Sequence, residues 1–360
     1  MRILLLGEYS SVQNNLAAAL IEKGHDVVLA NDGDNYKNYK RDIDLAGKHS
    51  NIVLRNLERI YKESKFAISA KGFDVVQLMS PLTFSRFGLT KSLHSKLKQN
   101  NGKLFFLAAG DDYFYWLGYR NCIYKYGPHQ GMLSDLKIKN IYYEGRRSQD
   151  INKHLLDIAN GVISCAVDYY IAYKDFAGEK LTNIPFPVNV KNIVKGELQA
   201  KANAPLKILH GIQSKRMGFK GSNYFIQALK ELKDYSSYFT YKEVRNLPYA
   251  EYQKELKECD ILFDQVNGYS PGMNAIEAMS YGKVVFGGCE DEYKVMNQLS
   301  IDPLINVRPN VEFIKSSIVK VLTDSDFYLT TSAKAKEYVF KKHDANVVAD
   351  QYLSFWEKAK

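Results

Sequence analysis

Residues 259–288 carry the clearest chemical pattern in the chain. Two short apolar runs, at residues 260–264 and 284–286, enclose a loop bracketed by Gly268 and Gly272 and a segment with helical spacing at residues 273–281. A strand that enters a helix through such a loop leaves free backbone N–H groups at the helix N-terminus, and these attract phosphate. Glu277 lies in the first turns of this expected helix, where its carboxylate could accept hydrogen bonds from sugar or ribose hydroxyls. An ordinary strand–helix–strand unit with a solvated Glu277 explains the spacing equally well.

A second candidate anion-binding loop lies one strand–helix unit earlier. We expect a strand at residues 206–209, a turn at residues 210–211 and a helix at residues 222–232. The loop region is basic and bounded by glycines: Gly211, Lys215, Arg216, Lys220 and Gly221. Arginine offers a planar fork and lysine a point charge, so together they could neutralise a diphosphate. A merely solvated basic loop is the alternative.

The N-terminal half offers two further loops at the ends of expected strands. Only one glycine, Gly7, follows the strand expected at residues 3–6, so the three-glycine dinucleotide fingerprint is absent and tightly bound NAD is not expected. Asp111 and Asp112 follow the strand expected at residues 103–109. Ligands of open α/β sheets bind beyond the carboxyl ends of strands, so these two acids are candidates for a base or a hydroxyl-binding pair. A solvated turn or a helix cap is the alternative.

Residues 113–147 are rich in aromatic and basic side chains. Tyrosine and tryptophan have apolar faces and polar tips, which suit stacking on sugar rings or contact with lipid headgroups. We expect this stretch to line one side of a binding cleft, with Trp116, His129 and, from the first turn, Tyr9 as contact residues. Core packing explains the aromatic residues equally well, and a loop histidine such as His129 is more often a surface residue.

No metal site is expected. Asp32 and Asp34 are separated by a single glycine, a spacing that can hold a divalent cation. The same spacing recurs at residues 42–44 and 324–326, which indicates chance. The aspartates around Gly33 are better explained as a polar loop after the second strand.

Composition indicates a globular protein of two domains. The chain has 360 residues, 46% of them hydrophobic and 25% charged, and no apolar run long enough to span a membrane or to act as a signal peptide. Four cysteines without metal-ligand spacing predict reduced core thiols of a cytoplasmic protein: Cys122, Cys165, Cys259 and Cys289. The net charge of +9 fits nucleic acid, an anionic membrane surface or anionic small substrates. No nucleic-acid module is present, so nucleic acid is not expected, whereas peripheral contact with an anionic membrane is compatible with the dispersed basic residues.

Strands and helices alternate in both halves of the chain, which predicts an α/β fold. Strands are expected at residues 3–6, 27–30, 73–79, 103–109, 161–166, 206–209, 239–242, 260–264 and 284–286, and helices at residues 11–23, 52–70, 90–99, 150–159, 168–174, 222–232, 249–258, 273–281, 311–322, 327–340 and 346–358. The polar segment 191–204 is the expected linker. The domains are therefore expected at residues 1–195 and 205–340, followed by a C-terminal helix at residues 341–360.

Two motifs in the second half resemble those of the GT-B glycosyltransferases, in particular the large retaining family 4. The family carries an arginine and a Lys-Gly pair after the first strand of its C-terminal domain, matched by Arg216, Lys220 and Gly221. It also carries a Glu-Ala-Met sequence at the head of a helix, followed by Gly-x-x-Val, matched from Glu277 to Val285. The IPFPVN segment at residues 184–189 and the last helix, with Tyr352 and Trp356, resemble the family's interdomain exit and its closing helix.

The resemblance implies two Rossmann-like doubly wound parallel-sheet domains that face each other across a cleft, with the C-terminal helix crossing back to the first domain. It implies transfer of a sugar from a UDP- or GDP-sugar to a hydroxyl of a glycan or lipid-linked acceptor, with retained configuration and without a metal or other cofactor. The setting would be synthesis of a bacterial surface polysaccharide or lipopolysaccharide in the cytoplasm or at the inner membrane face.

The resemblance also assigns roles to residues. Arg216 and Lys220 would stabilise the diphosphate leaving group, with Asp111 or Asp112 facing the acceptor. The donor would be bound by Gly7, Gly211, Lys215, Gly221, Asp264, Gln265, Tyr269, Gly272, Met273, Asn274 and Glu277. The acceptor would contact Tyr9, Trp116 and His129.

One position departs from the family pattern. The family usually has a second glutamate eight residues before the one matched by Glu277, and this chain has Tyr269 there. Asp264 and Gln265 could supply the polar contacts instead. Two alternatives therefore stay open: a sugar-nucleotide epimerase with the same fold, although its usual histidine-rich pocket is not evident, and a non-catalytic relative that binds a nucleotide sugar or partners an active transferase.

Overall fold

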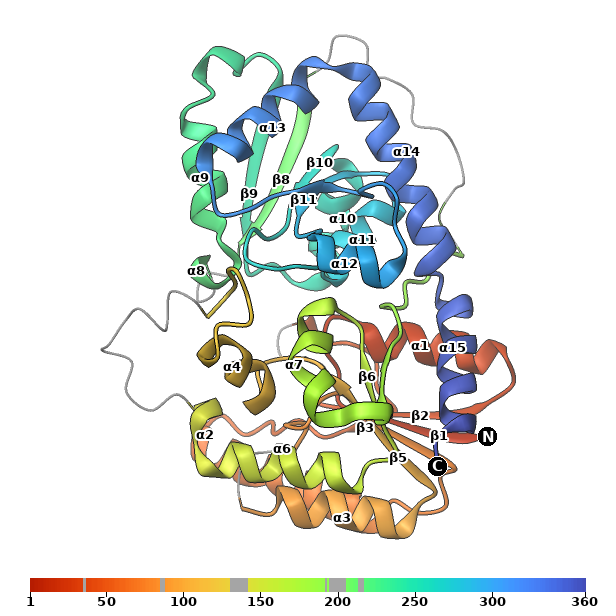
Figure 1. The fold of residues 1–360 in the computed structure, drawn as a ribbon. Coiled ribbons are helices and arrows are strands. Elements are labelled where there is room, and N and C mark those ends of the chain that lie inside the picture. The colour runs from red at the N-terminus through yellow and green to blue at the C-terminus, as the bar shows by residue number, and fades with distance from the viewer. Residues whose placement is uncertain (35–36, 85–87, 130–141, 192, 194–204, 213–216) are drawn as a thin grey trace.

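The computed structural model describes residues 1–34, 37–84, 88–129, 142–191, 193, 205–212 and 217–360 (Figure 1). Two parallel β-sheets follow one another along the chain, each with helices packed against it. The expectation of two doubly wound domains is confirmed. The linker expected at residues 191–204 lies outside the described residues, except for residues 191 and 193, so its position stays a prediction.

The first domain is built on a sheet of seven strands in the described chain, all of them parallel. In sheet order the strands are β3 (Ile43–Asp44), β2 (Asp26–Asn31), β1 (Arg2–Leu6), β4 (Val75–Leu78), β5 (Lys103–Ala108), β6 (Gly161–Ser164) and β7 (Leu181–Asn183). The helices are α1 (Val12–Glu22), α2 (Ile52–Ser69), α3 (Thr90–Asn100), α4 (Tyr113–Arg120), α6 (Arg146–Ile158) and α7 (Val167–Ala177), with short 3-10 turns η2 (Tyr142–Glu144) and η3 (Gly178–Lys180). Central strands such as β4 are buried along their whole length, which explains their continuous apolar sequence.

The second domain is built on a five-stranded parallel sheet in the described chain. Its order is β12 (Ile305–Asn306), β11 (Val284–Gly287), β10 (Ile261–Phe263), β8 (Leu206–Ile212) and β9 (Phe239–Arg245). The helices of this half and of the C-terminus are α8 (Met217–Lys220), α9 (Ser222–Lys230), α10 (Tyr249–Glu258), α11 (Met273–Ser280), α12 (Asp291–Asn297), α13 (Val311–Thr323), α14 (Ser325–Lys342) and α15 (Ala345–Lys358), with one 3-10 turn, η5 (Lys233–Tyr235).

Each sheet has one point at which the strand order reverses direction. In the first sheet this point lies between β1 and β4, and in the second between β8 and β10. The registers align the strand ends, because Leu6 lies beside Ala30 and Leu78, and Phe263 lies beside His210. Ligands of open α/β sheets bind in the crevice beyond the carboxyl ends of the strands at such points. A ligand site is therefore expected near the loops that follow β1 and β10.

The C-terminal helix crosses back to the first domain, as expected. α14 packs against α11 of the second domain, whereas α15 packs against α1 of the first (Figure 1). Trp356 is buried, and its indole N–H donates to Gln77 Oε1 of β4 at 3.3 Å. Lys103 Nζ donates to the backbone carbonyls of Trp356 and Glu357 at 3.0 and 2.8 Å. The end of the chain is thus part of the first domain's structure.

Most expected elements are present. Five short elements were not expected, namely α8, α12, β3, β7 and β12, and two further segments differ in type. The turn expected at residues 210–211 is strand, because β8 continues to Ile212 and pairs with β9 along its whole length. The aromatic stretch at residues 113–120 forms helix α4, whose inner face packs in the core. Among the cysteines, Cys122 is exposed, so the expectation of a core thiol is wrong for it; the other three are buried, and none of the four forms a disulfide bond. No helix in the described part of the chain is long and apolar enough to cross a membrane.

Candidate functional site

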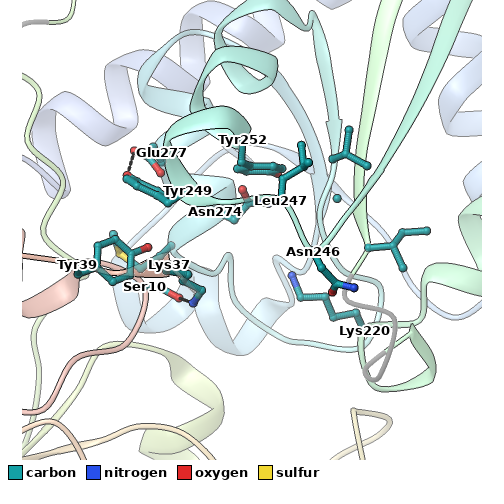
Figure 2. Close-up of a pocket in the computed structure, with 14 residues that line it drawn as sticks. Ser10, Lys37, Tyr39, Lys220, Asn246, Leu247, Tyr249, Tyr252, Asn274 and Glu277 are labelled. Carbon is teal, nitrogen blue, oxygen red and sulfur yellow. Dashed lines mark hydrogen bonds between the residues drawn. The ribbon is translucent and has the colours of Figure 1, made fainter. Parts of the chain in front are cut away.

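A pocket of about 750 Å³, including the part open to solvent, lies between the two domains (Figure 2). In the first domain, the loops that follow β1 and β2 line the pocket. In the second domain, β8, β9, the loop after β9 and helices α8, α10 and α11 line it. Its lining residues are Ser10, Lys37, Tyr39, Gly211, Ile212, Lys220, Val244, Asn246, Leu247, Tyr249, Tyr252, Met273, Asn274 and Glu277. Five of these were expected in a donor site from the sequence: Gly211, Lys220, Met273, Asn274 and Glu277. The pocket therefore joins both points of strand-order reversal.

Glu277 lies at one end of the pocket, on α11. Its Oε1 accepts a hydrogen bond from the hydroxyl of Tyr249 at 2.8 Å, and burial raises the pKa of its carboxyl group. The ring of Tyr249 lies 5.0 Å from the ring of Tyr39, so the two domains meet at this end (Figure 2). The carboxylate, two phenol hydroxyls and two aromatic rings form a surface suited to a ligand with hydroxyl groups and a flat ring.

Lys220 and Asn274 both donate hydrogen bonds to Asp264. Asp264 Oδ1 accepts from Lys220 Nζ at 3.3 Å and from Asn274 Nδ2 at 2.9 Å, while its Oδ2 has no hydrogen-bond partner among the described residues. Asp264 is 2% exposed and does not line the pocket itself. It holds a cation and an amide at the pocket wall, and so acts as a positioning residue. The ammonium group of Lys220 is available there to an anionic ligand.

Two glycines are required by close backbone packing near this wall. Gly221 has a φ of 73°, and a Cβ atom there would lie 2.9 Å from Cβ of Val266. A Cβ atom at Gly211 would lie 3.0 Å from the ring of Tyr252. Gly272 precedes α11 as its N-cap residue, and Met273 and Asn274 bring the first turn of the helix to the pocket. The free N–H groups of that turn add a partial positive charge to the site.

The first domain contributes a polar network that the sequence did not reveal. Lys37 Nζ donates to Asp34 Oδ2 at 2.6 Å and to Ser10 Oγ at 3.2 Å, and the backbone N–H of Ser10 donates to Asp34 at 3.0 Å. Ser10 and Ser11 both have left-handed backbone conformations, with φ values of 53° and 68°. Strain of this kind concentrates at functional sites. The only signal in the sequence was the Asp32-Gly33-Asp34 triplet, for which we expected a polar loop but no contact with Ser10 or Lys37.

Neither a protein-family model nor a curated protein sequence matches this chain. Solved structures do match. Sucrose-phosphate synthase from Thermosynechococcus elongatus superposes with a TM-score of 0.66 at 13% identity, over 99% of each chain. Anabaena HepE in complex with UDP-glucose superposes with a TM-score of 0.63 at 10% identity, over 98% of this chain and 99% of that one. A putative UDP-N-acetylglucosamine 2-epimerase from Listeria monocytogenes superposes with a TM-score of 0.55 at 12% identity, over 98% of this chain and 94% of that one.

The chain has the GT-B fold. The full-length superpositions and the two parallel sheets agree on this point. At these identities the likeness describes the architecture and leaves the reaction open.

The candidate residues of the first domain divide into three near the strand ends, namely Gly7, Tyr9 and Asp111, and several in the core. Gly7 ends β1 with a φ of 90°, and a Cβ atom there would lie 2.8 Å from Cβ of Met79. Tyr9 is 37% exposed, and its ring packs over Gly110, the residue before Asp111. Asp111 accepts from His129 Nε2 at 2.9 Å and from the Tyr143 hydroxyl at 3.3 Å.

Asp112 is not positioned to act on an acceptor. It is 1% exposed, caps α4 by accepting from the N–H of Tyr115 at 2.9 Å, and accepts from the hydroxyl of Tyr173. Burial raises the pKa of Asp112 to about 7. The helix-cap alternative is therefore correct for this residue.

Three other expected contact residues are buried. Trp116 and His129 are each 1% exposed, because α4 and the following loop pack into an aromatic cluster in which their rings lie 5.1 Å apart. Neither presents its ring to the pocket. Tyr269 is also 1% exposed and reaches into the first domain, where its hydroxyl accepts from the N–H of Lys125. All three side chains serve in packing or domain contact in this structure, and direct contact of any of them with a ligand stays a prediction.

The remaining donor candidates fall into two groups. Gln265 supports the loop that follows β10, with its Nε2 donating to the carbonyl of Ser270 at 3.4 Å. Lys215 and Arg216 lie outside the described residues. Among the described residues, no group of three histidine, cysteine, aspartate or glutamate side chains could hold a metal ion. Asp34 instead pairs with Lys37, and Asp32 with Arg59 at 3.2 Å.

Proposed function

We propose that this protein is a glycosyltransferase that moves a sugar from a nucleotide-sugar donor to a hydroxyl group of a glycan or lipid-linked acceptor. One observation carries the proposal: an interdomain pocket in a GT-B fold gathers Glu277, Asn274 and Lys220 beside the first turn of α11. The Anabaena protein of the same fold has UDP-glucose bound, which supports a nucleotide sugar as the ligand here.

The donor would extend from the Glu277 end of the pocket to the Lys220 end. Glu277 would accept hydrogen bonds from the ribose hydroxyls, with Tyr249 holding its carboxylate in place. The N-terminal turn of α11 and Lys220 would face the diphosphate, and Lys215 and Arg216 would add charge from the preceding loop. As the bond from the sugar to the diphosphate breaks, these groups would stabilise the charge that develops on the leaving group. Their cationic charge would serve where a metal ion serves in other enzymes, so we propose a metal-independent reaction.

The acceptor would approach from the first domain. Gly7, Tyr9 and Asp111 lie at the carboxyl ends of β1 and β5, and Asp111 would bind or deprotonate the acceptor hydroxyl. We propose retention of configuration and a place in bacterial surface-polysaccharide or lipopolysaccharide synthesis, on the strength of the motif resemblance at Arg216–Gly221 and Glu277–Val285.

Replacing Lys220 with alanine tests the proposed chemistry. Loss of one preorganised charge at the leaving group is expected to lower donor turnover by roughly two orders of magnitude. The measurement is release of nucleotide diphosphate from a panel of UDP- and GDP-sugars, with Lys230→Ala on the exposed face of α9 as the matched control. Wild-type turnover in a folded Lys220→Ala protein would contradict the assignment.

Two other functions have specific support. The position of Tyr269 in the interdomain contact, where the family usually has a donor-side glutamate, favours a non-catalytic protein that binds a nucleotide sugar. The likeness to the Listeria protein favours an epimerase. Nucleotide binding without turnover of any donor would support the first, and an epimerised donor sugar in the product would support the second.

A further inference from the structure

Helix α2 presents its apolar side chains outward. Its buried residues are Glu63 and Ala67, whereas six of its large apolar side chains, Ile52 and the five named next, are 46% to 64% exposed. These five, which we call the α2 stripe, are Val53, Leu54, Leu57, Tyr61 and Ile68. Spacings of four and seven residues place Val53, Leu57, Tyr61 and Ile68 on one face of the helix. An amphipathic helix normally turns its large apolar side chains toward the core, whereas in α2 Phe66 and Ala67 contact the core and the stripe does not.

Polar contacts hold the opposite face of α2 against the domain. Glu63 is 3% exposed and accepts from Arg59 Nε at 2.8 Å, and Arg59 also reaches Asp32 at 3.2 Å. Lys62 Nζ donates to the carbonyl of Ala46 at 2.7 Å. Turning the stripe inward would break the contacts that Arg59 and Lys62 make with Asp32 and Ala46 and would move the buried Glu63 to the surface, so these contacts favour the observed rotation. The stripe is therefore directed outward by the structure itself.

Basic side chains flank the stripe. Arg55 and Lys65 are exposed, and neither pairs with an acidic side chain in the described ranges of the chain. Lys65 Nζ lies 5.9 Å from the ring centre of Tyr61. The whole chain has a net charge of +9. An apolar face with basic flanks and a tyrosine at the boundary matches the pattern of helices that lie in the headgroup region of anionic bilayers.

The position of α2 in the fold leaves the pocket accessible. α2 packs beside α3, and α3 and α6 lie on the side of the first sheet that faces away from the second domain (Figure 1). The pocket lies between the domains. We propose that α2 is a membrane-docking helix, which binds an anionic phospholipid surface through the α2 stripe, Arg55 and Lys65. The inference rests on the surface of α2 alone and holds whether or not the protein transfers sugars.

A vesicle flotation assay with the full chain tests the proposal. The wild-type protein is expected to float with vesicles of phosphatidylglycerol and phosphatidylcholine, less at high salt, and not with phosphatidylcholine alone. The double variant Leu57→Glu/Tyr61→Glu is expected to lose roughly tenfold or more of this binding, since two apolar contacts become anionic. Val295→Glu, at a 79% exposed position on α12, is the matched control and is expected to bind as the wild type does. Thermal melting of the three proteins checks that each is folded.

Three results would overturn the proposal. The wild-type protein could fail to float with anionic vesicles, or the double variant could bind them as tightly as the wild type. In the third case, sedimentation would show a wild-type dimer that the double variant dissociates, and the stripe would then be an interface between two copies of the chain. Binding lost in Arg55→Glu/Lys65→Glu but kept in Val295→Glu would add support, because it would show that the flanking charges take part.

Discussion

At the scale of single residues, three carboxyl groups differ in whether they face the pocket or form hydrogen bonds within the protein. Glu277 is half-buried and lines the pocket, so its hydrogen-bonding capacity is available to a ligand. Asp264 works through Lys220 and Asn274. Asp112 serves as a helix cap and a partner for Tyr173. The three acidic residues therefore have different roles, which depend on their partners and on whether they face the pocket.

Asp112 gives a pH-dependent stability that can be measured. Burial raises its pKa to about 7, and raises that of Glu8 to about 7 as well. The folded protein then holds protons that the unfolded chain releases above about pH 4, so the free energy of unfolding should fall as the pH rises from about 4 to about 7. Asp112→Asn keeps a good cap and removes the titration, so this fall should be smaller, by on the order of 4 kcal/mol at most.

Denaturant unfolding at several pH values measures the effect. Asp326→Asn, at an exposed position on α14, is the control and should keep the wild-type dependence. Parallel curves for the wild type and Asp112→Asn would contradict the assignment of a buried, proton-binding carboxyl group to Asp112.

At the scale of elements, the loop from β10 to α11 connects the domains and leads into the helix whose first turn lines the pocket. The backbone N–H of Tyr269 donates to Asp168 Oδ1 at 2.9 Å, and the Ser270 hydroxyl donates to Asp168 Oδ2 at 2.8 Å. Asp168 belongs to the first turn of α7 in the first domain. Tyr269 thus contributes to domain contact at a position where the related family places a donor-side carboxylate.

Tyr269→Phe tests this structural role. The change keeps the ring, which packs on Tyr124 and Tyr126, but leaves the N–H of Lys125 without its acceptor. Loss of one part-buried hydrogen bond costs about 0.5–1.5 kcal/mol, so the free energy of unfolding should fall by that amount. Tyr238→Phe, with a ring that is 47% exposed, should change it little. Equal stability of both variants and the wild type would show that the Tyr269 hydroxyl does not hold the domains together.

Sequence patterns predicted the bounds of helices and strands better than they predicted which side chains contact one another in the fold. Helix α10 was expected at its observed bounds, because apolar spacing and a preceding proline define it locally. The aromatic residues of α4 were read as a binding surface, because tyrosine and tryptophan suit both a surface and a core. The Ser10, Asp34 and Lys37 network was missed, because it depends on loops from two strands meeting in space.

At the scale of the whole molecule, residues of both domains line the same pocket. The GT-B fold was predictable from two alternating halves and a closing helix, since each rests on local patterns. The pocket was predictable only on its second-domain side, where Lys220, Asn274 and Glu277 carry motifs. Tyr39 closes the same end as Glu277 through Tyr249, a contact that no pattern in either half could indicate.

Nucleotide binding tests the central claim most directly. A ligand that binds only the folded state stabilises it by about 2.7 kcal/mol at one hundred times its dissociation constant. UDP or GDP should therefore raise the melting temperature of the wild type and of Glu251→Ala, an exposed position on α10. The rise should be largely lost in Glu277→Ala. No rise in the wild type with UDP, GDP, ADP or CMP, or an undiminished rise in Glu277→Ala, would contradict a nucleotide-sugar site in this pocket.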